Sequence, residues 1–172
     1  MNTDEFMKQQ FLTLRDEIRE SKSRIFWILI IAIFLVMAAG YLAAEHPNAF
    51  AHAAIPFLLL ALMLTFICEQ NNIARAGRYL RETVEPRVQD LVGWEHWLES
   101  KPRLREVDHA FVMGFSALFL IFFAITTSLT LVQLDRTAHE AYVWAAAIAY
   151  TLGALCIFYV LVRHWRSSTA AT

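Results

Sequence analysis

Histidine is the residue type in this chain with the widest chemical range, because imidazole binds haem iron and metals and titrates near neutral pH. A membrane b-type haem uses a pair of axial histidines on facing helices. His52 could face His139, and His109 could face His164, but all four lie at the ends of apolar segments rather than inside them. These positions favour interfacial histidines, and a haem- or quinone-linked redox protein is the third of three functional hypotheses.

Motifs for enzymatic catalysis are missing from the sequence. Two cysteines, Cys68 and Cys156, are too few for a disulfide framework or a multi-cysteine metal cluster. There is no HExxH, no GxSxG and no glycine-rich phosphate loop. Arg103 and His109 have the spacing of some nuclease motifs, a spacing that often arises by chance. We therefore expect a protein that is not an enzyme, with no metal site and no cofactor.

Three arginines, Arg75, Arg78 and Arg81, follow one another at three-residue spacing after the second apolar segment. Such a series could bind an anionic ligand, for example a nucleotide or a lipid headgroup. Glu82 and other nearby carboxylates offer ion pairs within the helix instead, and this pairing is the interpretation that we favour.

Hydroxyl and carboxyl groups near the membrane suggest a second hypothesis, an oligomeric pore or channel-like effector. Thr126, Thr127 and Thr130 could line a narrow path, or could bond back to carbonyls of their own helix, which is commoner. Glu69 and Asp108 lie at the inner ends of the second and third segments, as a ring of charges at a pore mouth or as ordinary interfacial anchors. No charge lies near the centre of an apolar segment, which argues against a proton-coupled transporter.

The composition requires a membrane. The chain has 172 residues, of which 58% are hydrophobic and 18% charged, against about 45–50% and about 25% in soluble domains. Four segments approach or exceed the roughly 20 residues that a spanning helix needs, namely 25–44, 51–68, 110–134 and 142–162. The first is preceded by polar residues, unlike a signal peptide. The sequence therefore predicts an all-α, polytopic fold of four transmembrane helices in two hairpins.

Basic residues orient these spans. Fourteen of the fifteen Lys and Arg residues lie before the first span, between the second and third, or after the fourth. Because positive charge marks the cytoplasmic side, we expect both termini and the central loop in the cytoplasm. Fifteen basic against sixteen acidic residues leave no surplus for nucleic acid, which is not an expected partner.

The segments expected in the cytoplasm are predicted to be helical. Apolar residues recur at helical spacing over 4–24, after Cys68 as far as Pro86, and over 87–100. The last stretch is acidic and would be repelled by an anionic leaflet, so we expect Trp94 and Trp97 to lie against the neighbouring stalk helices. One chain supplies a thin cytoplasmic core. A homo-oligomer is therefore expected, with stalks that pair within or between chains.

Five parts follow from this pattern. They are a cytoplasmic amphipathic helix (1–24), a first transmembrane hairpin (25–68), a cytoplasmic helical loop (69–107), a second hairpin (108–162) and a cytoplasmic tail (163–172).

The central loop also carries a resemblance. The segments RYLRETVEP and GWEHWLE between two pairs of spans resemble a pattern in uncharacterised bacterial four-span membrane proteins, a family with no assigned activity. The matching residues are Arg78, Tyr79, Arg81, Glu82, Glu85, Pro86, Gly93, Trp94, Glu95, Trp97 and Leu98. The resemblance implies a bacterial origin, and with it the inner membrane, and a shared cytoplasmic element, but no chemistry.

The leading hypothesis is a non-enzymatic membrane protein that acts as a homo-oligomer embedded in the lipid bilayer. Its cytoplasmic helical element would bind a cytoplasmic protein or an anionic ligand. The candidate interface consists of Arg75, Arg78, Arg81, Glu82, Trp94 and Trp97.

Overall fold

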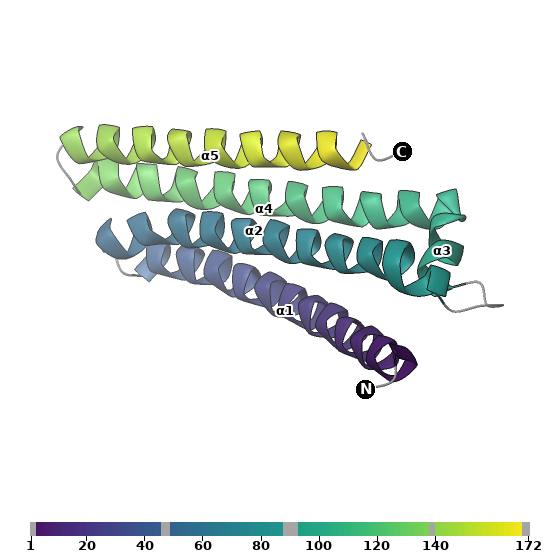
Figure 1. Cartoon of the computed structure of the whole chain (residues 1–172). Coiled ribbons are helices and arrows are strands. Elements are labelled where there is room, and N and C mark those ends of the chain that lie inside the picture. The colour runs from purple at the N-terminus through teal and green to yellow at the C-terminus, as the bar shows by residue number, and fades with distance from the viewer. Residues whose placement is uncertain (1–2, 46–48, 88–92, 138–139, 170–172) are drawn as a thin grey trace. The chain divides into compact units, whose positions relative to one another are not determined.

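The computed structural model describes residues 3–45, 49–87, 93–137 and 140–169, some of them by backbone alone, and every element in these ranges is helical. In chain order (Figure 1) the elements are α1 (Thr3–Glu45), α2 (Ala49–Tyr79), a π-helical turn η1 (Leu80–Val84), a 3-10 turn η2 (Glu85–Arg87), α3 (Trp94–Glu99), α4 (Pro102–Thr137) and α5 (Glu140–Thr169).

Four of these helices, α1, α2, α4 and α5, are long and apolar enough to cross a membrane, which confirms the all-α, multi-pass fold. The stretch predicted as helix over 4–24 and the first span form one continuous helix, α1, because no proline or glycine interrupts the sequence between them. Pro102 begins α4, where its missing N–H costs no helical hydrogen bond.

The predicted third amphipathic helix, 87–100, is shorter in the structure. Arg87 ends η2, and α3 begins only at Trp94, since Gly93 has an extended backbone with φ −63° and ψ 151°. Residues 88–92 lie outside the described residues.

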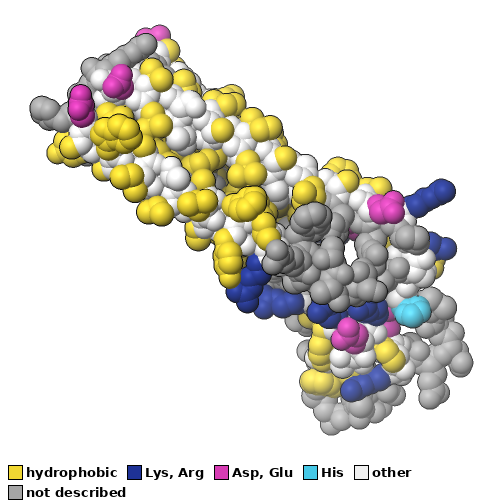
Figure 2. Space-filling view, turned by 90° about the horizontal axis from the view of Figure 1, so that it is seen from above, with side chains coloured by type: hydrophobic (Ala, Val, Ile, Leu, Met, Phe, Trp, Pro, Cys, Tyr) yellow, Lys and Arg dark blue, Asp and Glu magenta, His cyan; other side chains and the backbone are white. Residues whose placement is uncertain are grey.

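The chain divides into two compact units. Met1–Trp27 and Cys68–Phe115 form one, here named the stalk unit, and Ile28–Ile67 and Ser116–Thr172 form the other, named the apolar unit. In Figure 2, hydrophobic side chains cover the visible face of the apolar unit, and lysine and arginine side chains gather on the stalk unit.

Few of the side chains that the structure describes in the stalk unit are buried. Ala76, Leu80 and Val84 follow one another at four-residue spacing and form a buried stripe. On α1, Ser21 and Ile25 are buried at the same spacing. The core of this unit is therefore narrow.

The apolar unit is built around α2, the most buried of the four long helices. Its buried residues recur at helical spacing from His52 to Ile67. The Phe66 ring lies 5.7 Å from that of Phe119 on α4, and the Phe57 ring lies 5.0 Å from that of Tyr150 on α5. Helix α2 thus contacts both helices of the second predicted hairpin.

Candidate functional site

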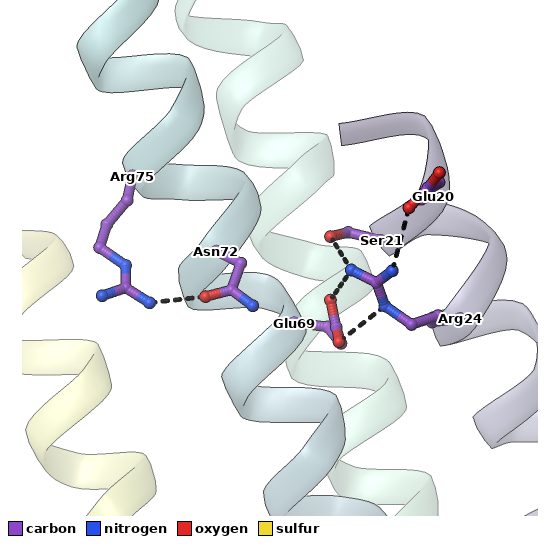
Figure 3. Close-up of polar contacts among 6 residues, drawn as sticks. All are labelled: Glu20, Ser21, Arg24, Glu69, Asn72 and Arg75. Atoms are coloured by element: carbon purple, nitrogen blue, oxygen red, sulfur yellow. Dashed lines mark hydrogen bonds and ion pairs between the residues drawn. The ribbon is translucent and has the colours of Figure 1, made fainter. Parts of the chain in front are cut away.

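Arg24 of α1 and Glu69 of α2 form a two-pronged ion pair in the stalk unit (Figure 3). Arg24 Nε donates to Glu69 Oε1 at 2.9 Å, and Arg24 Nη2 donates to Glu69 Oε2 at 3.1 Å. Arg24 Nη2 also donates to the buried Ser21 hydroxyl at 2.9 Å, and Nη1 lies 3.5 Å from Glu20 Oε2. This arrangement fastens α1 to α2 directly beyond the apolar segments 25–44 and 51–68.

The ion pair shifts the ionisation of both partners. The hydrogen bond from Arg24 lowers the pKa of the Glu69 carboxyl, with help from Ser21 and Asn72 and against the opposing effect of burial. The same hydrogen bond raises the pKa of Arg24. Glu69, predicted as a charge at a pore mouth, is thus a carboxylate engaged with α1. Asp108, the second predicted mouth charge, is exposed on α4.

The three predicted ligand-binding arginines have separate surroundings. Arg75 donates to Asn72 Oδ1 one turn away in the same helix. Arg78 is exposed on the last turn of α2. Arg81 lies in η1, where its Nη2 is 3.2 Å from Glu82 Oε1. Local pairing therefore engages Arg75 and Arg81.

A second contact joins the two stalk helices within one chain. Gln10 Nε2 donates to the Tyr79 hydroxyl oxygen at 2.8 Å, and the Arg87 guanidinium lies 3.6 Å from the Met7 sulfur. The stalks of α1 and α2 therefore pack against each other in a single chain, one of the two arrangements that the sequence left open.

The segment after α2 turns through a π-helical turn into a capped short helix. The Glu85 N–H donates to the Leu80 carbonyl five residues back, the spacing of a π-helix, and Glu85 keeps an α-helical backbone with φ −59° and ψ −39°. The Glu85 carboxylate then accepts a hydrogen bond from the His96 N–H at 2.8 Å, a donor in the first turn of α3 that has no helical partner. A Cβ at Gly93 would clash with this carboxylate, so glycine permits the close approach.

Helix α3 presents Trp97 at its surface. The Trp97 side chain is 40% exposed, and Lys101 Nζ lies 5.8 Å from its ring centroid. The Trp94 side chain lies outside the described residues. Trp97 thus occupies a fixed backbone position while much of its ring remains accessible.

Polar groups also gather inside the apolar unit, around a proline. Pro56 lies within α2 and has no N–H, so the His52 carbonyl four residues earlier loses its helical donor. Thr130 Oγ1 on α4 donates to that carbonyl at 2.9 Å. The Tyr150 hydroxyl on α5 donates to the carbonyl of Ala53 at 2.8 Å. Two neighbouring helices therefore supply hydrogen bonds to carbonyls near the proline, and the bond from Thr130 replaces the donor that Pro56 lacks.

The predicted pore-lining threonines belong to this interior. Thr126 is buried and donates to the Phe122 and Phe123 carbonyls of its own helix, at 2.9 and 3.2 Å. Thr130 is buried and engaged with α2, while the Thr127 hydroxyl has no hydrogen-bond partner among the described residues. In a single chain, the hydroxyls of Thr126 and Thr130 are therefore buried and hydrogen-bonded, and they do not line an open channel.

His52, expected at the end of an apolar segment, is buried inside the apolar unit. Its side chain is 1% exposed, and neither ring nitrogen has a hydrogen-bond partner among the described residues. His46 and His139 lie outside the described residues, as do the side chains of His109 and His164. Within the described ranges, no three His, Cys, Asp or Glu residues come together as a metal site.

Comparisons with protein-family models, with curated proteins and with solved structures gave no match to this chain. Two arrangements in the structure therefore bear on function. One is the stalk unit with its exposed tryptophan, and the other is the polar cluster around Pro56.

The sequence predicted the helices that carry these two arrangements, but not the hydrogen bonds within them. A proline inside an apolar segment was a signal that hydroxyl donors on other spans would be needed. Glu85 and Gly93 lie in the segment that resembles other four-span proteins. Nothing in their spacing indicates that the Glu85 carboxylate caps α3, the helix that follows Gly93.

Proposed function

We propose that this chain is a non-enzymatic protein of the bacterial inner membrane that acts as a homo-oligomer and binds a cytoplasmic protein through its stalk unit. The observation that carries the proposal is a narrow stalk core with large apolar side chains left outside it. Phe6 and Leu12 on α1 are about half exposed, at 49% and 53%, and Trp97 is 40% exposed. Extended apolar patches exposed on a protein mark surfaces that another protein covers, and we assign these side chains to such a surface.

The stalk unit holds this surface in a defined shape. The Arg24–Glu69 pair and the Gln10–Tyr79 hydrogen bond fix α1 against α2, and Glu85 fixes the start of α3. A preformed surface loses little conformational entropy on binding. Tryptophan and arginine are also the residues that most often dominate binding energy at protein interfaces.

The placement on the cytoplasmic side rests on the distribution of Lys and Arg. In the proposed arrangement, Phe6 and Leu12 contact other copies of the chain, and Trp97 contacts the cytoplasmic partner. The anionic-ligand alternative has less support, because Arg75 and Arg81 already have partners in the structure.

Site-specific photo-cross-linking in living cells tests this proposal. A photoreactive amino acid replaces Leu12, Trp97 or, as a control, Tyr159, which is more exposed than either and lies on α5 of the apolar unit. We expect a dimer-sized adduct from position 12 and a discrete adduct with another protein from position 97. Protein adducts at positions 12 and 97 no stronger than those at position 159 would contradict the proposal.

A further inference from the structure

The buried histidine of the apolar unit carries an inference independent of the proposed function. His52 has one N–H donor and one nitrogen acceptor when neutral, and both are buried. A buried polar group without a hydrogen bond destabilises the fold, because it has lost its hydrogen bonds to water and gained none in return. Since neither nitrogen has a partner among the described residues, something beyond those residues must compensate this loss.

The surroundings of His52 restrict what that group can be. The other buried polar residues described in the apolar unit have side chains without an ionisable group, namely Ser116, Thr126, Thr130 and Gln133. A charged ligand would find no countercharge on these four side chains and would carry a large desolvation cost. The compensating group is therefore neutral.

The group that compensates His52 must also be small. His52, Thr126, Thr130 and Tyr150 are each no more than 2% exposed, and Pro56 is fully buried beside them. These side chains belong to the protein interior, and protein interiors hold few spaces larger than a water molecule.

The neighbouring hydroxyls can take part in binding. Thr130 and Tyr150 each donate their hydrogen to an α2 carbonyl, so their oxygen lone pairs remain able to accept. Thr127, three residues before Thr130 on α4, has a buried hydroxyl oxygen that no described residue pairs with. The Thr127 hydroxyl can therefore donate a hydrogen bond, and the Thr130 and Tyr150 oxygens can accept one.

We propose that His52 is the centre of a buried water site inside the apolar unit, with water bridging its imidazole to the hydroxyls of α4. A buried water makes about three hydrogen bonds and is retained where polar groups lack other partners. The site places exchangeable hydrogen atoms inside a bundle whose surface is apolar, next to the His52 carbonyl that Pro56 leaves without a helical donor.

Nuclear magnetic resonance of the full chain in lipid nanodiscs, labelled with 15N-histidine, tests the proposal. Magnetisation transfer from water to each imidazole is measured, and the His52 signal is assigned by its loss in the His52→Gln variant. His96, exposed on α3, is the internal control for direct solvent contact. We expect transfer from water to the His52 ring, with hydrogen exchange slower than at His96. A His52 ring that receives no magnetisation from water would overturn the proposal.

Four variants separate water from other partners. Thr127→Val should weaken water transfer to His52, whereas Thr151→Val, which removes an exposed hydroxyl on α5, should not. Asn48 lies outside the described residues. If Asn48→Ala alone shifts the resonances of the His52 ring nitrogens while water transfer is absent, a protein side chain is the partner.

His52→Leu should lower the Tm, because the water and its other partners lose hydrogen bonds. A raised Tm in this variant would mean that the site is dry and would contradict the proposal.

Discussion

The hydroxyl of Thr130 donates to the carbonyl of His52, the carbonyl that Pro56 leaves without a helical donor. A proline inside a spanning helix is thus accommodated by a hydroxyl from another helix. The contact also sets the position of α2 against α4, because it requires the two residues to lie at the same level of the bundle.

Thr130→Val removes this hydrogen bond while keeping the side-chain shape. We expect a loss of about 1 kcal/mol of stability, the scale measured for hydrogen bonds between membrane helices, and hence a Tm lower by about 2–4 °C for a chain of this size. In a Pro56→Ala background the same substitution should cost less, since alanine returns an N–H to the His52 carbonyl. Equal costs in both backgrounds, measured by thermal unfolding in detergent, would contradict this role, and Thr151→Val is the matched control.

Tyr150→Phe should act in the same direction. The substitution removes the hydrogen bond to the Ala53 carbonyl and retains the ring contacts with Phe57 and Phe123. We expect a Tm lower by about 2–4 °C, as for a loss of about 1 kcal/mol. An unchanged Tm would show that the Ala53 carbonyl does not depend on Tyr150.

Gly93→Ala should loosen the start of α3. The added methyl group displaces the Glu85 carboxylate from the His96 N–H, so amide hydrogen exchange at residue 96 should become faster. Glu85→Ala should produce the same change. Gly114→Ala is the control, because a Cβ there meets no other group within 4 Å. Slow exchange at residue 96 in both test variants would contradict the proposed cap.

Acid should weaken the stalk unit through Glu69. The pKa of this carboxyl is lowered in the folded state, chiefly by the hydrogen bond from Arg24, so the folded state favours the ionised form. Its stabilising contribution is complete above the unfolded pKa, about 4.3, and is lost as the pH falls through the lower folded pKa. Wild type should therefore be more stable than Glu69→Gln at pH 7, with the difference vanishing at acidic pH. A difference that is independent of pH would show that the charge of Glu69 is unimportant.

Much of the fold could be predicted from the sequence, because a bilayer imposes the length and apolar character of each helix. The span over 25–44 and the helix before it were readable in this way. The hydrogen bonds from Thr130 and Tyr150 were not, since they depend on which helices become neighbours and at what level. The π-helical turn and the Glu85 cap likewise depend on local geometry that residue spacing does not encode.

Native mass spectrometry of the chain released from lipid nanodiscs tests most directly whether the narrow stalk core is completed by other copies. The chain has a mass of 19.8 kDa, so each subunit adds a known step. We expect a single defined multimer for the wild type and its dissociation when Phe6 and Leu12 are both replaced by serine. A wild type that is monomeric across lipid compositions and protein concentrations would contradict the proposed homo-oligomer.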